Sequence, residues 1–443
     1  MPLALLYSLW YILREQKQTQ EEYNLEKLVI TGPTPLKGEV EINGAKNAAV
    51  AILPATLLIN GICTINNLPN ISDVQILCTI LEKMGAQITW NNKNEITIDT
   101  TNVNTTQAPL DLTSKFRASY YLIGAMLGRT GNIEVGMPGG CKLGARPIDQ
   151  HIKGFELLGA DVEVKKGTIV AKANCLTGNS IYMDIVSVGA TINIMLAAVL
   201  AKGTTIIDNA AKEPHIVDVA NFLNTMGADI RGAGTDVIKI NGVEKLHGNA
   251  TYSVVPDQIE AGTFMLAALA SKGDLTIKNC ITKHLDSLTA KILEMGGNVE
   301  DNGDSIRVWY SKRPNKANIK TLPYPGFPTD LQPQMGVVLA TANGTSIINE
   351  SIWESRFQYT GELNKMGANI TAQGKSAIFE GVDELFGSPV YSTDLRAGAA
   401  LIIAGISATG ITEIYNLEHI DRGYENIEEK FRKIGANIQR IHE

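Results

Sequence analysis

Leu81-Glu-Lys-Met-Gly-Ala86 is the first of six copies of one short pattern, and this pattern decides the fold. The other copies keep the glycine and an apolar residue before it: Phe155–Ala160, Leu223–Ala228, Ile292–Gly297, Leu363–Ala368 and Phe431–Ala436. The copies recur at a nearly constant interval along the chain. Glycine directly after an amphipathic run is typical of a helix C-terminus, because glycine readily takes the left-handed conformation needed there. Each copy therefore predicts a helix that ends at its glycine and is followed by an alternating strand.

An Ala- and Leu-rich run precedes each copy and predicts a second helix, buried because it carries almost no charge. We expect these helices to end at Gly61, Gly131, Gly203, Gly273, Gly344 and Gly410. Each unit of about 70 residues then contains helix, strand, helix, strand and a further strand. Because open repeat arrays use units of roughly 20–50 residues, we expect two compact lobes of three repeats each. The division falls near residues 255–257, where Pro256 interrupts the pattern.

Composition narrows the class of protein. The 443 residues allow two or three domains. A formal net charge of −7 excludes general attraction to nucleic acid or to an anionic membrane, so any anionic ligand must be held by locally gathered basic residues. Five irregularly spaced cysteines argue against a disulfide framework and indicate a reducing compartment. No Cys-x-x-Cys or His-Glu-x-x-His motif predicts a metal site.

The segment 1–24 does not continue the repeat pattern. Its apolar run at residues 2–13 is shorter than the ~20 residues of a spanning helix. It also lacks the basic start and the cleavage site of a secretory signal. We expect residues 1–24 to form a poorly ordered extension outside the fold.

Charged residues mark the predicted N-termini of the buried helices. Counting back from the closing glycines places these N-termini at Lys46, Arg117, Val188, Ile259, Asp330 and Arg396. A cation at a helix N-terminus opposes the helix dipole, whereas a bound anion is favoured there. Lys46, Arg117 and Arg396 therefore predict a shared anionic ligand, while Asp330 alone could be a simple helix cap.

A glycine-rich loop at 136–151 carries a single cysteine, Cys141, behind two glycines and close to Arg146. Glycine and proline oppose a helix here, so we expect an exposed turn and a chemical role for the thiol. Arg356 and Arg422 occupy the equivalent loops of later repeats. Pseudo-symmetry should gather these basic residues at one end of each lobe, so that two facing lobes enclose a basic cleft.

Six motifs occur in order along the chain: Gly44–Ala49, Arg117–Ser119, Gly139–Pro147, Phe327–Asp330, Asp394–Arg396 and His419–Glu425. Together they resemble the family of UDP-N-acetylglucosamine 1-carboxyvinyltransferases, and the resemblance runs from about Leu25 to Glu443. It implies two inverse α/β barrel domains, each of three pseudo-repeats, with the active site in the interdomain cleft. The first lobe would comprise residues 46–255, and the second would comprise 25–45 and 256–443.

The resemblance also implies a reaction. Enolpyruvate would pass from phosphoenolpyruvate to the 3-hydroxyl of UDP-N-acetylglucosamine, with release of phosphate, by addition and elimination through a tetrahedral intermediate. This is the first committed step of peptidoglycan precursor synthesis. It needs an acid, a base and cations, but no cofactor and no metal. The expected partners are the two small-molecule substrates, without nucleic acid, stable membrane insertion or an obligate protein partner, and the expected location is the cytoplasm.

Four residues have implied catalytic roles. Cys141, on a mobile loop, would be the general acid and the target of the epoxide fosfomycin. Asp330 would lie beside the sugar hydroxyl, and Lys46 and Arg422 would hold the phosphate of phosphoenolpyruvate. The implied substrate-binding residues are Lys46, Asn47, Arg117, Arg146, Pro147, Ile148, Asp149, Gln150, Ser187, Val188, Gly189, Asp330, Ile352, Arg356, Asp394, Arg396 and Arg422. Within this set, Arg146 would also hold the phosphate, and Arg356 and Arg396 would lie near the donor carboxylate.

Two alternatives stay open. The sister enolpyruvyl transferase that acts on shikimate 3-phosphate shares the fold and the donor, but it does not use a loop cysteine as its acid. A non-catalytic repeat protein that binds nucleotide sugars could also carry charged helix N-termini. The combination of Cys141 with Asp330 favours an enzyme, and phosphate release with each acceptor would separate the three hypotheses.

Overall fold

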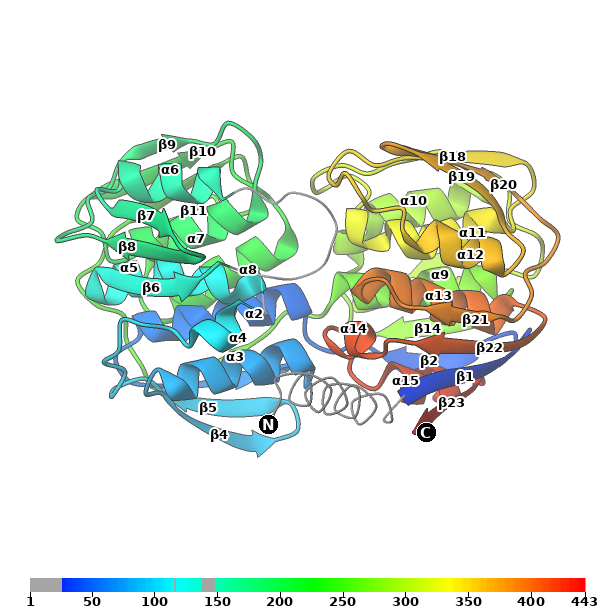
Figure 1. The fold of residues 1–443 in the computed structure, drawn as a ribbon, viewed down its shortest axis with the longest axis horizontal. Coiled ribbons are helices and arrows are strands. Elements are labelled where there is room, and N and C mark those ends of the chain that lie inside the picture. The colour runs from blue at the N-terminus through cyan, green and yellow to red at the C-terminus, as the bar shows by residue number, and fades with distance from the viewer. Residues whose placement is uncertain (1–25, 115–116, 138–147, 443) are drawn as a thin grey trace, which may run out of the picture.

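The computed structural model describes residues 26–114, 117–137 and 148–442, which form two lobes (Figure 1). One buried core contains residues between Ala45 and Val254. The other contains residues between Ile259 and Ile438 together with Leu28–Ile42 from the start of the described chain. The two N-terminal strands, β1 (Glu26–Gly32) and β2 (Lys37–Glu41), therefore belong to the second lobe, and the chain passes between the lobes twice.

Three helices fill the centre of each lobe. They are α2 (Lys46–Ala55), α5 (Tyr121–Thr130) and α7 (Val188–Ala198) in the first lobe, and α9 (Gln258–Ala270), α11 (Gln332–Ala340) and α13 (Leu395–Ser407) in the second. Nearly all of their residues are buried, as the absence of charge predicts. Small residues let these helices approach closely, and α5 packs on α7 as α11 packs on α13. The helices lie inside and the sheets outside, which is the inverse α/β barrel arrangement (Figure 1).

The second helix of each repeat covers the outside of this centre. These helices are α3 (Ser72–Lys83), α6 (Asp149–Leu157), α8 (Pro214–Thr225), α10 (Asp286–Glu294), α12 (Tyr359–Lys365) and α15 (Ile427–Lys433). All six pattern glycines follow them with φ between +89° and +105°. The predicted left-handed glycine at each helix C-terminus is therefore confirmed.

The second set of glycines was predicted less well. Only Gly131 caps its helix, α5, with φ +69°. The helix α2 ends at Ala55 and continues as a 3-10 turn, η1 (Thr56–Leu58), before Gly61. Gly203, Gly273 and Gly344 likewise lie beyond their helix ends, in the turns that lead into the strands, and Gly410 is the first residue of β22. The prediction that they close the helices is wrong because the helices end earlier.

Each repeat also builds one sheet. The first-lobe strands are β3 (Ile62–Asn66), β4 (Gln87–Asn92), β5 (Glu95–Asp99), β6 (Asn132–Gly136), β7 (Asp161–Lys165), β8 (Thr168–Lys172), β9 (Ser180–Tyr182), β10 (Thr204–Asp208), β11 (Asp229–Arg231), β12 (Val237–Asn241) and β13 (Ala250–Ser253). The second-lobe strands are β14 (Asp274–Lys278), β15 (Asn298–Asp301), β16 (Ser305–Trp309), β17 (Ile319–Lys320), β18 (Thr345–Asn349), β19 (Asn369–Gln373), β20 (Ser376–Glu380), β21 (Pro389–Tyr391), β22 (Gly410–Tyr415) and β23 (Asn437–His442). Most of the sheets share one spatial order, in which a parallel edge strand is followed by the first, third and second strands of the repeat.

The sixth sheet obtains its third strand from the other end of the chain. Its order is β21-β22-β1-β23, so that β1 lies between β22 and β23 and pairs antiparallel with both. The fourth sheet similarly takes β2 as its parallel edge strand beside β14. The N-terminal strands thus complete the sheets of two C-terminal repeats.

The two connections between the lobes pair with each other. The Ala45 N–H donates to the Val255 carbonyl at 2.7 Å, and the Asp257 N–H donates to the Asn43 carbonyl at 2.9 Å. The crossing thus lies beside Pro256, where the repeat pattern breaks. Short turns complete the fold: α4 (Leu110–Thr113), η2 (Arg117–Tyr120), η3 (Thr282–Leu285), η4 (Thr329–Leu331) and α14 (Glu418–Asp421). Every helix in the described ranges is too short or too polar to span a bilayer, and the expected extension at 1–24 lies outside those ranges.

Gly124 provides a test of the close helix packing. A Cβ at this position would lie 2.2 Å from the Asn193 carbonyl oxygen on α7. We expect Gly124→Ala to destabilise the protein by about 1–3 kcal/mol, as overpacking of a core does. Gly361 in α12 is the control, because a Cβ there has no neighbour within 4 Å. Gly361→Ala should be neutral or slightly stabilising, and equal thermal denaturation midpoints for the two variants would contradict the packing argument.

Candidate active site

The N-termini of the central helices lie at or within a few residues of the positions that the sequence predicts. Helix α2 begins at Lys46 and α7 at Val188. Arg117 and Asp330 lie in the 3-10 turns η2 and η4 that lead into α5 and α11. The remaining two helices begin one residue early, so that Ile259 and Arg396 are their second residues, after the N-caps Asp257 and Asp394. Aspartate at these two caps satisfies main-chain N–H groups that would otherwise lack partners.

Two of the predicted cations meet across the boundary between the lobes. Lys46 Nζ lies 3.1 Å from Asp73 Oδ2, and Arg422 Nε donates to Asp73 Oδ1 at 2.8 Å. Asp73 is buried in the first turn of α3, and Arg422 follows α14 in the second lobe. The buried carboxylate compensates only one of two positive charges, so this cluster keeps a net positive charge. An anion can bind where these two cations meet.

Asp330 lies between two further cations within the second lobe. Arg356 Nη2 donates to Asp330 Oδ1 at 3.1 Å, and Arg396 Nη2 donates to Asp330 Oδ2 at 3.0 Å. Both arginines are buried. Burial raises the pKa of Asp330, but Arg396, Arg356 and Lys46 lower it more, so its pKa is well below the usual range. Asp330 is therefore fully ionised near neutral pH.

Arg396 is stabilised in its charged form by its surroundings. Its guanidinium lies 5.4 Å from the centre of the Tyr424 ring. Burial lowers the pKa of Arg396, but Asp330 and Tyr424 raise it more, so that its pKa is above the ordinary arginine value. Asp394 caps α13 by accepting hydrogen bonds from the Arg396 and Ala397 N–H groups at 2.8 and 3.1 Å. The predicted site residue Asp394 thus holds the main chain that carries Arg396.

His215, which the sequence analysis did not single out, also lies at this boundary. It lines a small pocket with Asn47 and with the linker residues from Val255 to Ile259. Burial lowers the pKa of His215, although Glu213, Asp330 and Asp257 act in the opposite direction. The imidazole is therefore neutral near pH 7 and offers one donor and one acceptor. The sequence around His215, a single histidine after Glu213 and Pro214, contains no motif that would have predicted this location.

A second group of predicted residues gathers within the first lobe around Tyr120 and His151. The Arg117 guanidinium lies 5.5 Å from the Tyr120 ring centre, and the Tyr120 and His151 rings meet edge to face. Burial and the nearby Arg117 lower the pKa of His151 to about 3, so it is neutral. A Cβ on Gly189 would lie 2.6 Å from the Tyr120 hydroxyl, so only glycine fits there. This arrangement brings η2, α6 and α7 together.

The hydrogen bonds of Gln150 and Ser187 are largely made within the protein. Gln150 Nε2 donates to Asp149 at 3.0 Å and to Asp184 at 3.1 Å, and its oxygen accepts from the Asp184 N–H at 2.9 Å. The Ser187 hydroxyl caps α7 by accepting from the Ala190 N–H at 3.3 Å. Ile148 directly precedes α6, and Val188 begins α7. Gln150 therefore orients the carboxylates beside it.

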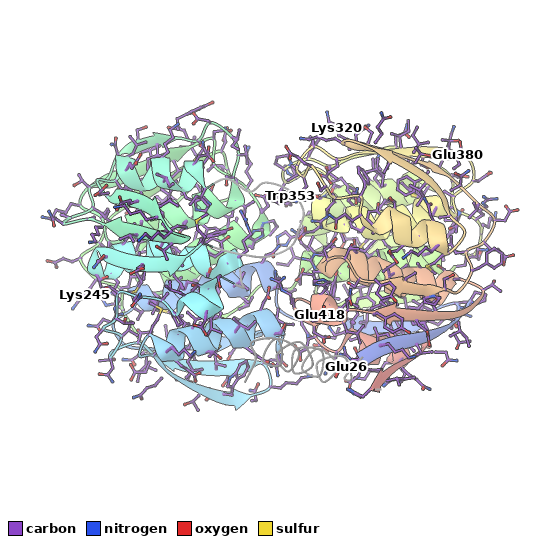
Figure 2. All side chains as sticks on the ribbon, in the orientation of Figure 1. Glu26, Lys245, Lys320, Trp353, Glu380 and Glu418 are labelled. Carbon is purple, nitrogen blue, oxygen red and sulfur yellow. The ribbon has the colours of Figure 1, made fainter. Side chains whose placement is uncertain are left out.

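Not every predicted residue joins these groups. The Ile352 N–H donates to Glu350 at 2.8 Å, and the next residue, Trp353, lies at the edge of the second lobe that faces the first (Figure 2). Cys141, Arg146 and Pro147 lie outside the described residues. Among the described residues, no group of three His, Cys, Asp or Glu side chains could hold a metal ion.

A buried carboxylate, Glu425, joins the lobes beside the Asp73 cluster. Its Oε2 accepts hydrogen bonds from Asn43 Nδ2, the Asn70 N–H and Asn94 Nδ2 at 2.8, 2.8 and 2.9 Å. Lys93 Nζ lies 2.8 Å from its Oε1. Glu425 comes from the second lobe, whereas three of these partners come from the first lobe or its loops. Its position in the motif that contains Arg422 was visible in the sequence, but its partners near the other end of the chain were not.

Comparison with known proteins places the chain in a family. The family model described as EPSP synthase (3-phosphoshikimate 1-carboxyvinyltransferase) matches residues 30–431. A UDP-N-acetylglucosamine 1-carboxyvinyltransferase from Clostridium botulinum is 58% identical over 418 residues, which cover 94% of this chain and 100% of that protein. UDP-N-acetylglucosamine 1-carboxyvinyltransferase 3 from Caldanaerobacter subterraneus subsp. tengcongensis is 55% identical over 419 residues, 95% of this chain and 100% of that protein.

Solved structures give the same fold. The enolpyruvyl transferase NikO from Streptomyces tendae is 25% identical and matches with a TM-score of 0.86, over 95% of this chain and 100% of that chain. EPSP synthase from Acinetobacter baumannii is 18% identical and matches with a TM-score of 0.73, over 94% of this chain and 100% of that chain. At 18% identity the second likeness concerns the fold alone.

Glu425→Gln tests the contact between the lobes. The variant keeps the shape, but it removes the charge opposite Lys93 and turns one acceptor into a donor that faces other donors. Leaving a buried group unsatisfied costs about 1–3 kcal/mol, so amide exchange of the loops at Asn70 and Asn94 should accelerate roughly tenfold or more. The control is Glu418→Gln on α14. Glu418 is exposed, and this substitution removes the same negative charge without breaking a buried contact (Figure 2). Equal exchange in both variants would show that Glu425 does not hold the lobes together.

Proposed function

The chain belongs to the EPSP synthase family of carboxyvinyl transferases, and we propose that the site between its lobes catalyses the reaction of UDP-N-acetylglucosamine 1-carboxyvinyltransferase. The enzyme transfers the enolpyruvyl group of phosphoenolpyruvate to the 3-hydroxyl of UDP-N-acetylglucosamine and releases phosphate. This is the first committed step of peptidoglycan precursor synthesis. The observation that supports it best is the identity of 58% and 55%, over nearly the whole chain, with two relatives of that name.

The two cation clusters suit the two anionic groups of the donor. Lys46 and Arg422, with Arg146, hold the tetrahedral phosphate as it leaves. Arg356 and Arg396 hold the planar carboxylate, whose geometry matches that of guanidinium groups. The site thereby compensates the charge of the leaving phosphate with fixed side chains and requires no cofactor.

The chemistry requires one base and one acid. Asp330 accepts the proton of the sugar 3-hydroxyl as that oxygen bonds to C2 of phosphoenolpyruvate. Cys141 donates a proton to C3, which gives the tetrahedral intermediate. In the second step C3 gives a proton back to the Cys141 thiolate, the bond from C2 to the phosphate oxygen breaks, and the enol double bond forms again. Asp330 passes the proton that it took from the hydroxyl to the leaving phosphate. Addition followed by elimination therefore conserves atoms and charge at each step.

The residues around Tyr120 and His151 bind the nucleotide sugar. The proposed contacts are Asn47, Arg117, Pro147, Ile148, Asp149, Gln150, Ser187, Val188 and Gly189, with Ile352 and Asp394 contributed by the second lobe. Arg117 faces the anionic diphosphate, and the absence of a side chain at Gly189 lets the Tyr120 ring lie close to the start of α7. The neutral His151 packs edge to face on the Tyr120 ring and fixes its position.

The domains follow the two cores in this proposal. Residues 46–255 form the first lobe, residues 25–45 and 256–443 form the second, and residues 1–24 remain an extension outside the fold. The substrates, phosphoenolpyruvate and UDP-N-acetylglucosamine, bind between the lobes. The reaction takes place in the cytoplasm.

Acceptor-dependent phosphate release tests the function. With phosphoenolpyruvate present, the purified protein should release phosphate when UDP-N-acetylglucosamine is added, and it should not when shikimate 3-phosphate is added. Turnover of shikimate 3-phosphate would assign the sister activity instead. Binding of the nucleotide sugar without any phosphate release would support the non-catalytic alternative.

Asp330→Asn tests whether Asp330 is the catalytic base. The sequence also allowed a simple helix cap, but within the described residues no main-chain N–H donates to this side chain, so capping does not explain the aspartate. An amide cannot accept the proton of the hydroxyl, and loss of a general base costs about 10²–10⁴ in rate. We expect a protein that is less stable but still folds and binds the nucleotide sugar, with kcat at least about a hundredfold lower. Turnover within a few-fold of the unmodified enzyme would mean that the base lies elsewhere.

Cys141 should be the thiol that reacts with electrophiles. Burial raises the pKa of Cys63 and of Cys78 to about 12 and that of Cys280 to about 11, so these thiols are unreactive near neutral pH. Cys175 is exposed and serves as an internal control for simple accessibility. Peptide mapping after treatment with fosfomycin and the nucleotide sugar should find the adduct on Cys141. An adduct on Cys175 instead would contradict the assignment.

The identity of the acid at position 141 is tested by substitution. Cys141→Asp keeps a proton donor and should retain part of the activity while it escapes alkylation. Cys141→Ser should be far less active, because a serine hydroxyl is too weak an acid near neutral pH. Comparable kcat values for the serine and aspartate variants would argue against proton donation by this residue.

A further inference from the structure

In the ligand-free protein Asp330 is a weak base. Both of its carboxylate oxygens accept hydrogen bonds from buried arginines. A carboxylate in that position is stabilised in its ionised form and attracts a further proton weakly. The pKa of Asp330 is correspondingly depressed, since the effect of Arg396 and Arg356 exceeds that of burial. A base for the sugar hydroxyl would need to be released from these contacts first.

The second observation is that, among the residues that the structure describes, only the two arginines hold Asp330. The described residues provide no other hydrogen bond to its side chain, and it caps no main-chain N–H group. Asp257 and Asp394, by contrast, are each fixed by two main-chain N–H groups of their helices. Asp330 can therefore leave its partners without breaking a helix cap.

The aspartates of the two cation clusters also differ in how far solvent can reach them. Asp73, between Lys46 and Arg422, exposes 1% of its side chain, whereas Asp330 exposes 27%. A ligand that enters between the lobes can thus reach Asp330 but not Asp73. Asp73 is a permanent counter-charge, and Asp330 is an exchangeable one.

The arginines have hydrogen-bonding capacity left over. Arg356 Nε and Arg396 Nη1 are buried, and neither has a hydrogen-bond partner within the described part of the chain. Each guanidinium donates one hydrogen bond, from Nη2, to Asp330. A planar carboxylate that enters the site could accept from these unused donors and then take the place of the aspartate, because the two groups have the same geometry.

We propose that the carboxylate of the enolpyruvyl donor displaces Asp330 from Arg356 and Arg396 and so releases Asp330 to act as the base. Asp330 and the donor carboxylate compete for one pair of arginines, and the base is freed only in a site that already holds the donor. The inference rests on the proposed function. It gives Arg356 and Arg396 a second role, since they restrain the base until the donor binds.

If Asp330 and the donor carboxylate compete for the same arginines, removing the negative charge of Asp330 changes the affinity for carboxylate ligands. Removing the internal competitor in Asp330→Asn should strengthen the binding of a carboxylate ligand. The probes are pyruvate, which has the carboxylate without the phosphate, and inorganic phosphate, both titrated calorimetrically with saturating UDP-N-acetylglucosamine. Pyruvate should bind Asp330→Asn at least about tenfold more tightly than the unmodified enzyme. Phosphate should gain less than about threefold, because it does not take the place of Asp330.

Asp73→Asn is the matched control, because it removes the same charge from the neighbouring cluster. It should not strengthen pyruvate binding by more than about threefold. Equal gains for pyruvate and phosphate in Asp330→Asn would indicate general electrostatics and overturn the proposal. An unchanged pyruvate affinity would also overturn it. If Asp73→Asn does not fold, the comparison of the two probes in Asp330→Asn still decides.

Failure of this inference is separable from failure of the proposed function. If the unmodified enzyme releases no phosphate with UDP-N-acetylglucosamine, the function itself is wrong. If it does so while Asp330→Asn gains no pyruvate affinity, the function stands, and Asp330 is not restrained by the arginines.

Discussion

Like-charge repulsion is the constraint on which the organisation of the site depends. Four cations, Lys46, Arg356, Arg396 and Arg422, must lie close together before any ligand arrives. In a partly buried position such a group would be strongly destabilising without counter-charges. Two aspartates provide them, each between two cations, so the protein tolerates a basic centre although its overall charge is negative. One of these carboxylates also serves the contact between lobes, and the other lies within reach of the substrates.

The repeat unit explains how these charges reach one place. The N-termini of the buried helices come together within a lobe, so residues far apart in the sequence, such as Asp330 and Arg396, become neighbours. The helices themselves contribute packing and a favourable dipole, and the turns before them contribute the functional side chains. The buried part of each central helix is therefore apolar in all six repeats, while the residue at its N-terminus differs from repeat to repeat.

Much of this organisation could be predicted from the sequence, because it depends on local patterns. The left-handed glycines, the buried helices and the residues at the helix N-termini all follow from short-range periodicity. The sequence did not reveal Asp73, because an acidic residue in the first turn of α3 is common for reasons of the helix dipole alone. It also did not reveal the partners of Glu425, which are brought together by the contact between lobes. The depressed basicity of Asp330 likewise depends on two side chains 26 and 66 residues away.

The placement of β1 between β22 and β23 has a consequence for synthesis on the ribosome. The first lobe is continuous from the crossing at Ala45 to the crossing at Val255, so it has all of its strands before the second half is made. The two N-terminal strands must meanwhile stay unpaired, because their partners β14, β22 and β23 are translated much later. Unpaired strands are prone to pair with other chains. The nascent protein therefore carries β1 without its sheet partners until its last residues emerge, and this segment is open to pairing with other chains during that time.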